Sequence, residues 1–128
     1  MLSAPAADFD LVMDVHKGHV SAMVRAISIN PRVIESILQE IRQTLAGERL
    51  GHLLLEFELA HALGESEMFE IMQTFSSVMP GLKIAVMNRD SRQHSSLQFG
   101  VQVSQEFGQD YRYFTDAEAA DKWLAEQT

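Results

Sequence analysis

The acidic pair Glu56 and Glu58 is the first feature of the sequence that could do chemistry. Two carboxylates that face each other across a cleft can act as the acid and the base of a glycosidase. These residues lie in the segment 52–59, where apolar and polar residues alternate as they do in a strand. Residues two positions apart on a strand lie side by side on one face, so they do not flank a substrate. We therefore interpret them, together with Asp14, as part of a sheet face that is open to water.

Histidine is the second residue type that could form a site, as a metal ligand or as a base. The five histidines are His16, His19, His52, His61 and His94. No two of them have the four-residue spacing that places both rings on one face of a zinc-binding helix. The sequence contains no cysteine, which excludes disulfides, thiolate catalysis and cysteine-ligated zinc. We therefore predict no metal site, no cofactor and no catalytic residue.

The segment 88–92 is a candidate anion or ligand loop, because it follows a short apolar strand and opens a helix. Open α/β sheets bind ligands at that position, and the start of a helix favours anions. Arg89, Ser91 and Arg92 are the residues that could hold a phosphate or a carboxylate. The alternative is a charged loop in which Asp90 or Ser91 caps the helix. No glycine-rich phosphate loop accompanies the segment, so it does not indicate nucleotide binding.

Composition limits the classes of function. With 128 residues, of which 46% are hydrophobic and 22% charged, the chain has room for one globular domain. Its formal net charge of −8 opposes binding to nucleic acid or to an anionic membrane. No stretch approaches the roughly 20 apolar residues of a membrane span, and residues 1–8 lack the features of a secretion signal. We expect a cytoplasmic protein with a mobile lead-in at 1–8 and a single domain at 9–128.

Hydrophobic periodicity and turn residues predict strands and helices along the chain. An antiparallel hairpin is expected first, because only a short turn at Lys17-Gly18 separates two strand-like segments. Strands are predicted over 11–16, 19–29, 52–59, 83–87 and 111–114, and helices over 31–47, 65–79, 91–107 and after 115. This order predicts an α/β fold with a mixed sheet of about five strands and four helices mainly on one face.

The sequence also predicts where the helices begin and end and which side chains of the second helix are buried. Gly47 stands where the first helix needs a cap, and Thr115 with Glu118 matches a capping box for the last helix. Gly100 weakens the prediction of the third helix, since glycine is a poor helix former. The second helix is expected to bury the stripe Met68, Phe69, Ile71, Met72, Phe75 and Met79.

The carboxyl-terminal segment carries a resemblance to a known family. Tyr113-Phe114-Thr115-Asp116 leads into Glu118-Ala119 and then Trp123-Leu124. With the order of elements along nearly the whole chain, it resembles the anti-sigma-factor antagonist (STAS) superfamily, and more closely its SpoIIAA-like bacterial branch. That branch has an aromatic strand, an acidic turn and a helix of the pattern E-A-x-x-W-L; this sequence has one more residue before the tryptophan. The resemblance implies a SpoIIAA-like fold and a module for protein interaction or ligand sensing, not an enzyme.

The resemblance also implies a switch residue. Founding antagonists carry a phosphorylatable serine in an Asp-Ser-x-Gly turn that opens the second helix. The matching turn here is Gly64-Glu65-Ser66-Glu67, so the resemblance makes Ser66 the candidate phosphorylation position. The turn lacks the aspartate before the serine and the glycine after it, and its glutamates would repel the charge of about −2 that a phosphate adds. A helix cap is the alternative interpretation of Ser66.

We therefore predict a non-enzymatic STAS-like regulatory module that acts through a protein partner or as a homodimer. Neither nucleic acid nor a membrane span is expected. A carrier of a small apolar ligand or lipid is the alternative, because the seven methionines, several of them on the second predicted helix, suit a deformable apolar pocket. An unrecognised hydrolase is a third hypothesis, which no constellation of residues supports.

Overall fold

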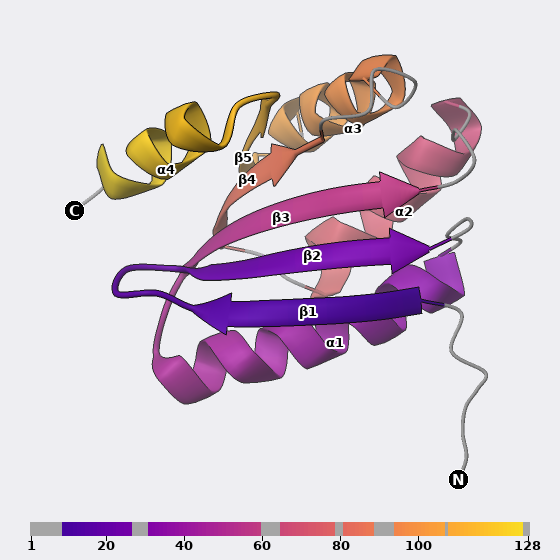
Figure 1. Cartoon of the computed structure of the whole chain (residues 1–128). Coiled ribbons are helices and arrows are strands. Elements are labelled where there is room, and N and C mark those ends of the chain that lie inside the picture. Colours follow the sequence, from indigo (N-terminus) through magenta and orange to yellow (C-terminus); the bar gives the residue numbers. More distant parts are fainter. Residues whose placement is uncertain are drawn as a thin grey trace, which may run out of the picture.

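The computed structural model describes residues 9–26, 31–59, 65–78, 81–88, 94–106 and 108–126. These residues form strands and helices in the order that the sequence predicts (Figure 1). The elements are β1 (Phe9–Val15), β2 (Val20–Ala26), α1 (Pro31–Glu48), β3 (His52–Leu59), α2 (Glu65–Val78), β4 (Lys83–Met87), α3 (His94–Glu106), β5 (Asp110–Phe114) and α4 (Ala117–Glu126). The predicted lead-in at 1–8 and the predicted element ends at 27–29, 79, 91–93 and 107 lie outside the described residues. None of the helices within those ranges is long and apolar enough to cross a membrane.

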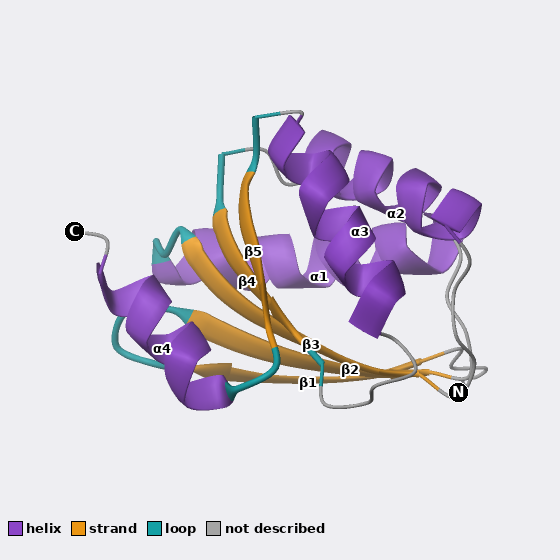
Figure 2. Ribbon diagram, turned by 90° about the horizontal axis from the view of Figure 1, so that it is seen from above, coloured by secondary structure: helices purple, strands orange, loops and turns teal. Residues whose placement is uncertain are grey.

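The described strands form one mixed sheet in the order β1-β2-β3-β4-β5. β1 and β2 are antiparallel, with Phe9 opposite Ala26, so the hairpin prediction is confirmed, whereas β2 to β5 run parallel. Every crossover between parallel strands moves to the next strand in the same direction. Right-handed crossovers of this kind must place their helices on the same face. Figure 2 shows the result: α1, α2 and α3 cover one face, and α4, which follows the edge strand β5, lies on the other.

The main core lies between the sheet and the three helices on its first face. In β3, Leu53, Leu55 and Phe57 are buried, as the alternation in that segment predicts. The buried stripe of α1 consists of Ile34, Ile37, Leu38, Ile41 and Leu45. Burial of one such side chain contributes about 1.5–3 kcal/mol. The three- and four-residue spacing in the sequence therefore decides which side of α1 faces the sheet.

A smaller core cluster lies under α4 on the second face. It joins Ala85 of β4 to Ala120, Trp123 and Leu124 of α4. Lys83 is buried beside it, with 6% of its surface exposed. The Lys83 Nζ donates a hydrogen bond of 2.7 Å to the Trp123 carbonyl and lies 4.4 Å from the centre of the indole ring. α4 therefore covers both an apolar patch of the sheet and an ammonium group.

α1 ends later than the sequence predicts. Gly47 lies within the helix, and Arg49 instead adopts the left-handed conformation, with φ of 57°. The Arg49 N–H donates to the Ala46 carbonyl at 3.2 Å, and the Leu50 N–H donates to the Leu45 carbonyl at 3.0 Å, which is a Schellman motif. The prediction that Gly47 caps the helix is therefore wrong. Leu50 packs against the main core, and this apolar contact fixes the end of the helix after the glycine.

Arg49→Gly is expected to stabilise the fold by about 1 kcal/mol, because a side chain makes the left-handed conformation cost about 1–2 kcal/mol. Urea unfolding of the two chains measures the difference. Gly108 offers the reverse experiment: it has φ of 84° and follows α3 in the same motif, in which the Gln109 N–H donates to the Ser104 carbonyl at 3.0 Å. Gly108→Ala is expected to destabilise the fold by a similar amount. A loss of stability in Arg49→Gly would show that the arginine side chain, not backbone strain, dominates at this position.

α4 begins one residue after the position that the predicted capping box requires. The Asp116 Oδ2 accepts a hydrogen bond of 3.1 Å from the Ala119 N–H, and the Asp116 carbonyl accepts the first helical hydrogen bond from the Ala120 N–H. Asp116 is therefore the N-cap, and the prediction of Thr115 with Glu118 as a capping box is wrong. The carboxylate satisfies a free N–H and also places negative charge at the positive end of the helix.

Candidate interaction site

Ser66 and the predicted anion loop each follow one of two neighbouring parallel strands in the chain. β2, β3 and β4 are parallel, so their carboxyl ends lie together, where the arrowheads of β2 and β3 point in Figure 1. α2 follows β3 at this end, and the segment 89–92 follows β4. Open α/β sheets bind their ligands outside the carboxyl ends of the strands. Ser66 and the predicted loop 89–92, which the sequence suggests for independent reasons, are therefore connected to the neighbouring strands β3 and β4.

Ser66 lies in the first turn of α2, and its side chain is exposed. α2 begins at Glu65, so Ser66 lies inside the helix and not at the residue before it. The start of a helix favours an added negative charge. Glu67 and Glu70 are exposed nearby and oppose that charge. Phosphorylation of Ser66 stays a prediction.

Phe69 is exposed, although the sequence predicts that α2 buries it. Its exposed fraction is 37%. The buried stripe of the helix is Met68, Ile71, Met72, Phe75 and Val78. Phe69 follows the first of these residues by one position, which turns it about 100° around the helix axis and away from the core. It lies three residues after Ser66, so both side chains share one face of α2.

The spacing of the apolar residues in the sequence could have indicated that Phe69 is exposed. Five apolar residues at three- and four-residue spacing already fill the core-facing side of α2, and Phe69 has no place in that series. Aromatic side chains in exposed positions are enriched where proteins bind other proteins. Ser66 and Phe69 together form the surface that we call the α2 start surface.

The predicted anion loop lies beyond the described part of β4. Arg89, Ser91 and Arg92 are outside the described residues, so their role in binding an anion or ligand stays a prediction. Asn88, immediately before them, is 2% exposed. Burial raises the pKa of Tyr113 above its ordinary value, and a hydrogen bond with the Asn88 side chain lowers it in part. Asn88 thereby joins the end of β4 to the neighbouring strand β5.

The acidic pair lies on the open half of the second sheet face. Glu58 is exposed and Glu56 half-buried, and Asp14 is exposed on the same face. Arg25 and Glu58 occupy paired positions of β2 and β3, and the Arg25 Nε lies 2.5 Å from the Glu58 Oε1. Exposed ion pairs of this kind contribute only about 0–1 kcal/mol. The acids follow the strands side by side, which confirms a solvated sheet face.

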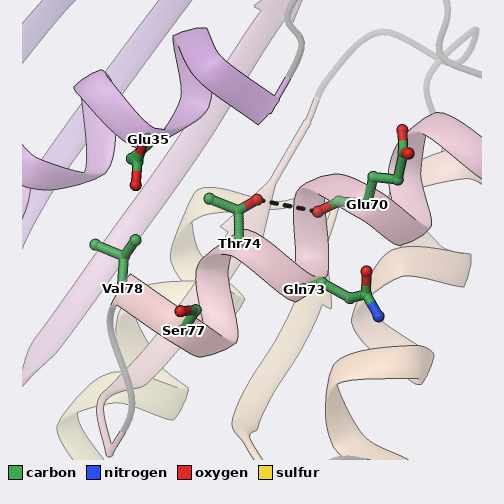
Figure 3. Close-up of a pocket in the computed structure, with 6 residues that line it drawn as sticks. All are labelled: Glu35, Glu70, Gln73, Thr74, Ser77 and Val78. Atoms are coloured by element: carbon green, nitrogen blue, oxygen red, sulfur yellow. Dashed lines mark hydrogen bonds between the residues drawn. The ribbon is translucent and has the colours of Figure 1, made fainter.

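A shallow pocket of about 360 Å³ lies between α1 and α2 (Figure 3). Its lining consists of Glu35 from α1 and of Glu70, Gln73, Thr74, Ser77 and Val78 from α2. The Thr74 hydroxyl donates a hydrogen bond of 3.1 Å to the Glu70 carbonyl. Only Val78 is apolar in this lining, so the pocket does not favour an apolar ligand. The lipid-carrier alternative stays a prediction, which this pocket does not support.

A group of histidines lies at the opposite end of the sheet. His16 and His19 of the β1–β2 hairpin stack with ring centres 4.7 Å apart, and the His19 Nε2 lies 3.8 Å from the Asp121 Oδ1 of α4. Burial lowers the pKa of His19; the charges of His16 and His52 add to this, and Asp121 opposes it. Within the described ranges, no three His, Asp or Glu side chains are placed to hold a metal ion. Spacing in the sequence could not reveal this group, because the hairpin, β3 and α4 meet only in the fold.

The free energy of unfolding is expected to decrease as the pH falls through the ordinary pKa of histidine, about 6.5. The unfolded chain binds a proton at His19 more readily than the folded chain does, because folding lowers that pKa. This part of the stability is complete above the ordinary pKa and is lost below it. Urea unfolding between about pH 7.5 and about pH 5.5 should show a smaller loss for His19→Gln than for the unaltered chain. His16→Gln removes a repelling charge, so its loss of unfolding free energy should lie between those of His19→Gln and the unaltered chain. Equal losses in all three chains would contradict a lowered pKa of His19 as the cause.

Comparison with known proteins supports the fold. No protein-family model matches the sequence, and no curated protein matches it. The structure is similar to the crystal structure of an anti-sigma factor antagonist from Mycobacterium paratuberculosis, with a TM-score of 0.62 and 14% identity over 97% of this chain and 99% of that one. It is also similar to an uncharacterised protein of the DUF3478 family with a SpoIIAA-like fold from Shewanella loihica PV-4, with a TM-score of 0.56 and 13% identity over 97% and 99% of the two chains. The prediction of a SpoIIAA-like fold is confirmed.

Proposed function

We propose that this SpoIIAA-like chain is a non-enzymatic regulatory module that acts by binding a protein partner. The observation that carries the proposal is the α2 start surface, where an exposed aromatic ring and an exposed hydroxyl share one helix face. This surface lies at the carboxyl end of the parallel strands, the end at which folds of this class bind other molecules. The likeness to a protein named as an anti-sigma factor antagonist also favours a protein partner.

The histidine group of the β1–β2 hairpin and β3 does not supply a base for Ser66. A serine nucleophile needs a base within hydrogen-bond reach. His52 is the first residue of β3, and Ser66 follows the other end of that strand, which has 8 residues. A strand of this length spans roughly 25 Å. The histidine group at the amino end of β3 is therefore too far away to activate Ser66.

The chemistry of the α2 start surface indicates what the partner presents. Phe69 would enter an apolar pocket, since buried aromatic anchors contribute most to protein interfaces. Glu67 and Glu70 border it and are exposed, so basic residues around the pocket would complement them. The net charge of −8 would speed the encounter with such a partner.

Phe69→Ala is expected to weaken partner binding at least about tenfold, because an aromatic anchor contributes about 2 kcal/mol or more. Affinity purification from the cells that express the chain identifies the partner, and titration of the purified pair gives the dissociation constant. Gln43→Ala is the matched control: it also shortens an exposed side chain, but on α1. It should leave the dissociation constant unchanged.

Circular dichroism first establishes that both variants fold. The proposal fails if the partner binds Phe69→Ala and the unaltered chain equally well. It fails also if purification enriches no protein above a tag-only control.

A further inference from the structure

The outer strand β1 forms a second surface that is separate from the α2 start surface. β1 lies at one edge of the sheet and pairs with β2 alone among the described strands. Its outer edge therefore presents backbone N–H and C=O groups to which no described strand is paired. An edge of this kind is a template for an additional strand, and main-chain hydrogen bonds supply most of the affinity in such complexes.

The two faces of β1 differ in the neighbours that they offer to an added strand. Phe9, Leu11 and Met13 are partly buried and pack against the main core on the side of α1. Val12, at the middle of the strand, points to the other face and is 59% exposed. An added strand would therefore place apolar residues beside the core on one face and a small apolar residue beside Val12 on the other.

Charge determines which kind of strand fits. Asp10 and Asp14 are exposed on either side of Val12 and share its face of the sheet. Like charges opposite each other on neighbouring strands are destabilising, and opposite charges are stabilising. A second copy paired antiparallel about Val12 would place Asp10 of each copy opposite Asp14 of the other. The net charge of −8 adds repulsion between copies at longer range.

We propose that the edge of β1 binds an extended segment of a partner protein in which two basic residues stand four positions apart and the three residues between them are apolar. Lysine or arginine side chains of that segment pair with Asp10 and Asp14, and an apolar residue between them contacts Val12. Its backbone continues the sheet beyond β1. The proposal goes beyond the proposed function, because it uses neither Ser66 nor Phe69 and requires no other part of α2.

The experiment uses as the probe a short acetylated and amidated peptide with lysine at every fourth position and valine at the positions between. Nuclear magnetic resonance of the isotopically labelled full chain should show amide shifts that concentrate in β1 and β2. Asp10→Lys/Asp14→Lys should bind this peptide at least about tenfold more weakly and should instead bind the peptide in which glutamate replaces each lysine. Glu40→Lys/Glu48→Lys makes the same change in net charge at exposed positions of α1 and should bind the lysine peptide within about twofold of the unaltered chain.

A peptide that carries N-methyl groups on alternate amides separates strand pairing from simple charge attraction. Methylation of the amides that face β1 removes the donors and should abolish binding, whereas methylation of the opposite set should not. Equal binding of both methylated peptides, equal affinity for the Asp10→Lys/Asp14→Lys chain, or shifts located in α2 would overturn the proposal. A concentration-dependent dimer with protected β1 amides would also overturn it and assign the edge to a second copy. Phe69→Ala should leave peptide binding unchanged, so the two proposals can fail separately.

Discussion

Gly100→Val is expected to destabilise the fold by about 2–3 kcal/mol, because α3 crosses close to α2 at this glycine. A Cβ at position 100 would lie 2.6 Å from the Met68 Cγ, 2.8 Å from the Met68 Sδ and 3.0 Å from the Met72 Cγ. Carbon atoms make their best contact at about 3.5–4.0 Å, so either the methionines or the whole helix must move. Urea unfolding of the two chains measures the loss.

The control for this prediction is a glycine in a helix that has free space around it. Gly47 lies within α1, and a Cβ there would meet nothing within 4 Å. Gly47→Ala should therefore stabilise the fold by about 0.5–1 kcal/mol, the ordinary gain in helix propensity. On a Met68→Ala background, which makes room beside Gly100, the cost of Gly100→Val should be smaller. Equal stability of Gly100→Val and the unaltered chain would contradict the close crossing of α2 and α3.

Trp123→Ala is expected to release α4 from the sheet, with a loss of about 3–4 kcal/mol. Trp123 is 8% exposed, and its ring centre lies 5.6 Å from that of Phe114. The variant also removes the ring that covers the Lys83 ammonium group. No residue of α4 belongs to the main core cluster, so the loss should remain local. Hydrogen exchange should therefore become fast over 117–126 and stay slow in β3 and β4.

Lys122→Ala is the control for this second prediction, because Lys122 is exposed on the same helix. It should leave both stability and exchange unchanged within about 0.5 kcal/mol. Loss of protection across β3 and β4 in Trp123→Ala would contradict the division into two core clusters. It would show instead that α4 is part of one cooperative unit with the main sheet.

Features of the fold that depend on local pattern could be predicted from the sequence. The alternation in β3 and the apolar stripe of α1 each correspond to the buried side chains of the structure. Right-handed crossovers then place the first three helices on one face, because the strands follow one another across the sheet in the order β1-β2-β3-β4-β5, which the structure supplies. α4 follows the last strand and enters no crossover, so its placement on the second face depends on packing alone.

Features that depend on contacts between distant segments could not be predicted. From the sequence, Gly100 is expected to weaken the third helix. The structure explains the glycine, because α2 packs so closely against α3 at this position that a side chain would clash with Met68 and Met72. α1 ends at Glu48, one residue past Gly47, because the contact of Leu50 with the core outweighs the conformational preference of the glycine. In the candidate site, the position of Ser66 could be predicted only from the resemblance to the anti-sigma-factor antagonists. The prediction that α2 buries Phe69 is wrong, because the residue falls outside the three- and four-residue spacing of the buried stripe.

Photo-crosslinking from the start of α2 tests most directly the claim that this surface binds a protein partner. A photoreactive benzoylphenylalanine replaces Phe69 in cells that express the chain, and in the control it replaces Arg42, which is exposed on α1. Illumination should yield one discrete adduct from position 69, with the mass of the chain plus one partner, and no adduct from position 42. The absence of an adduct at position 69, or the same adduct from both positions, would contradict the claim.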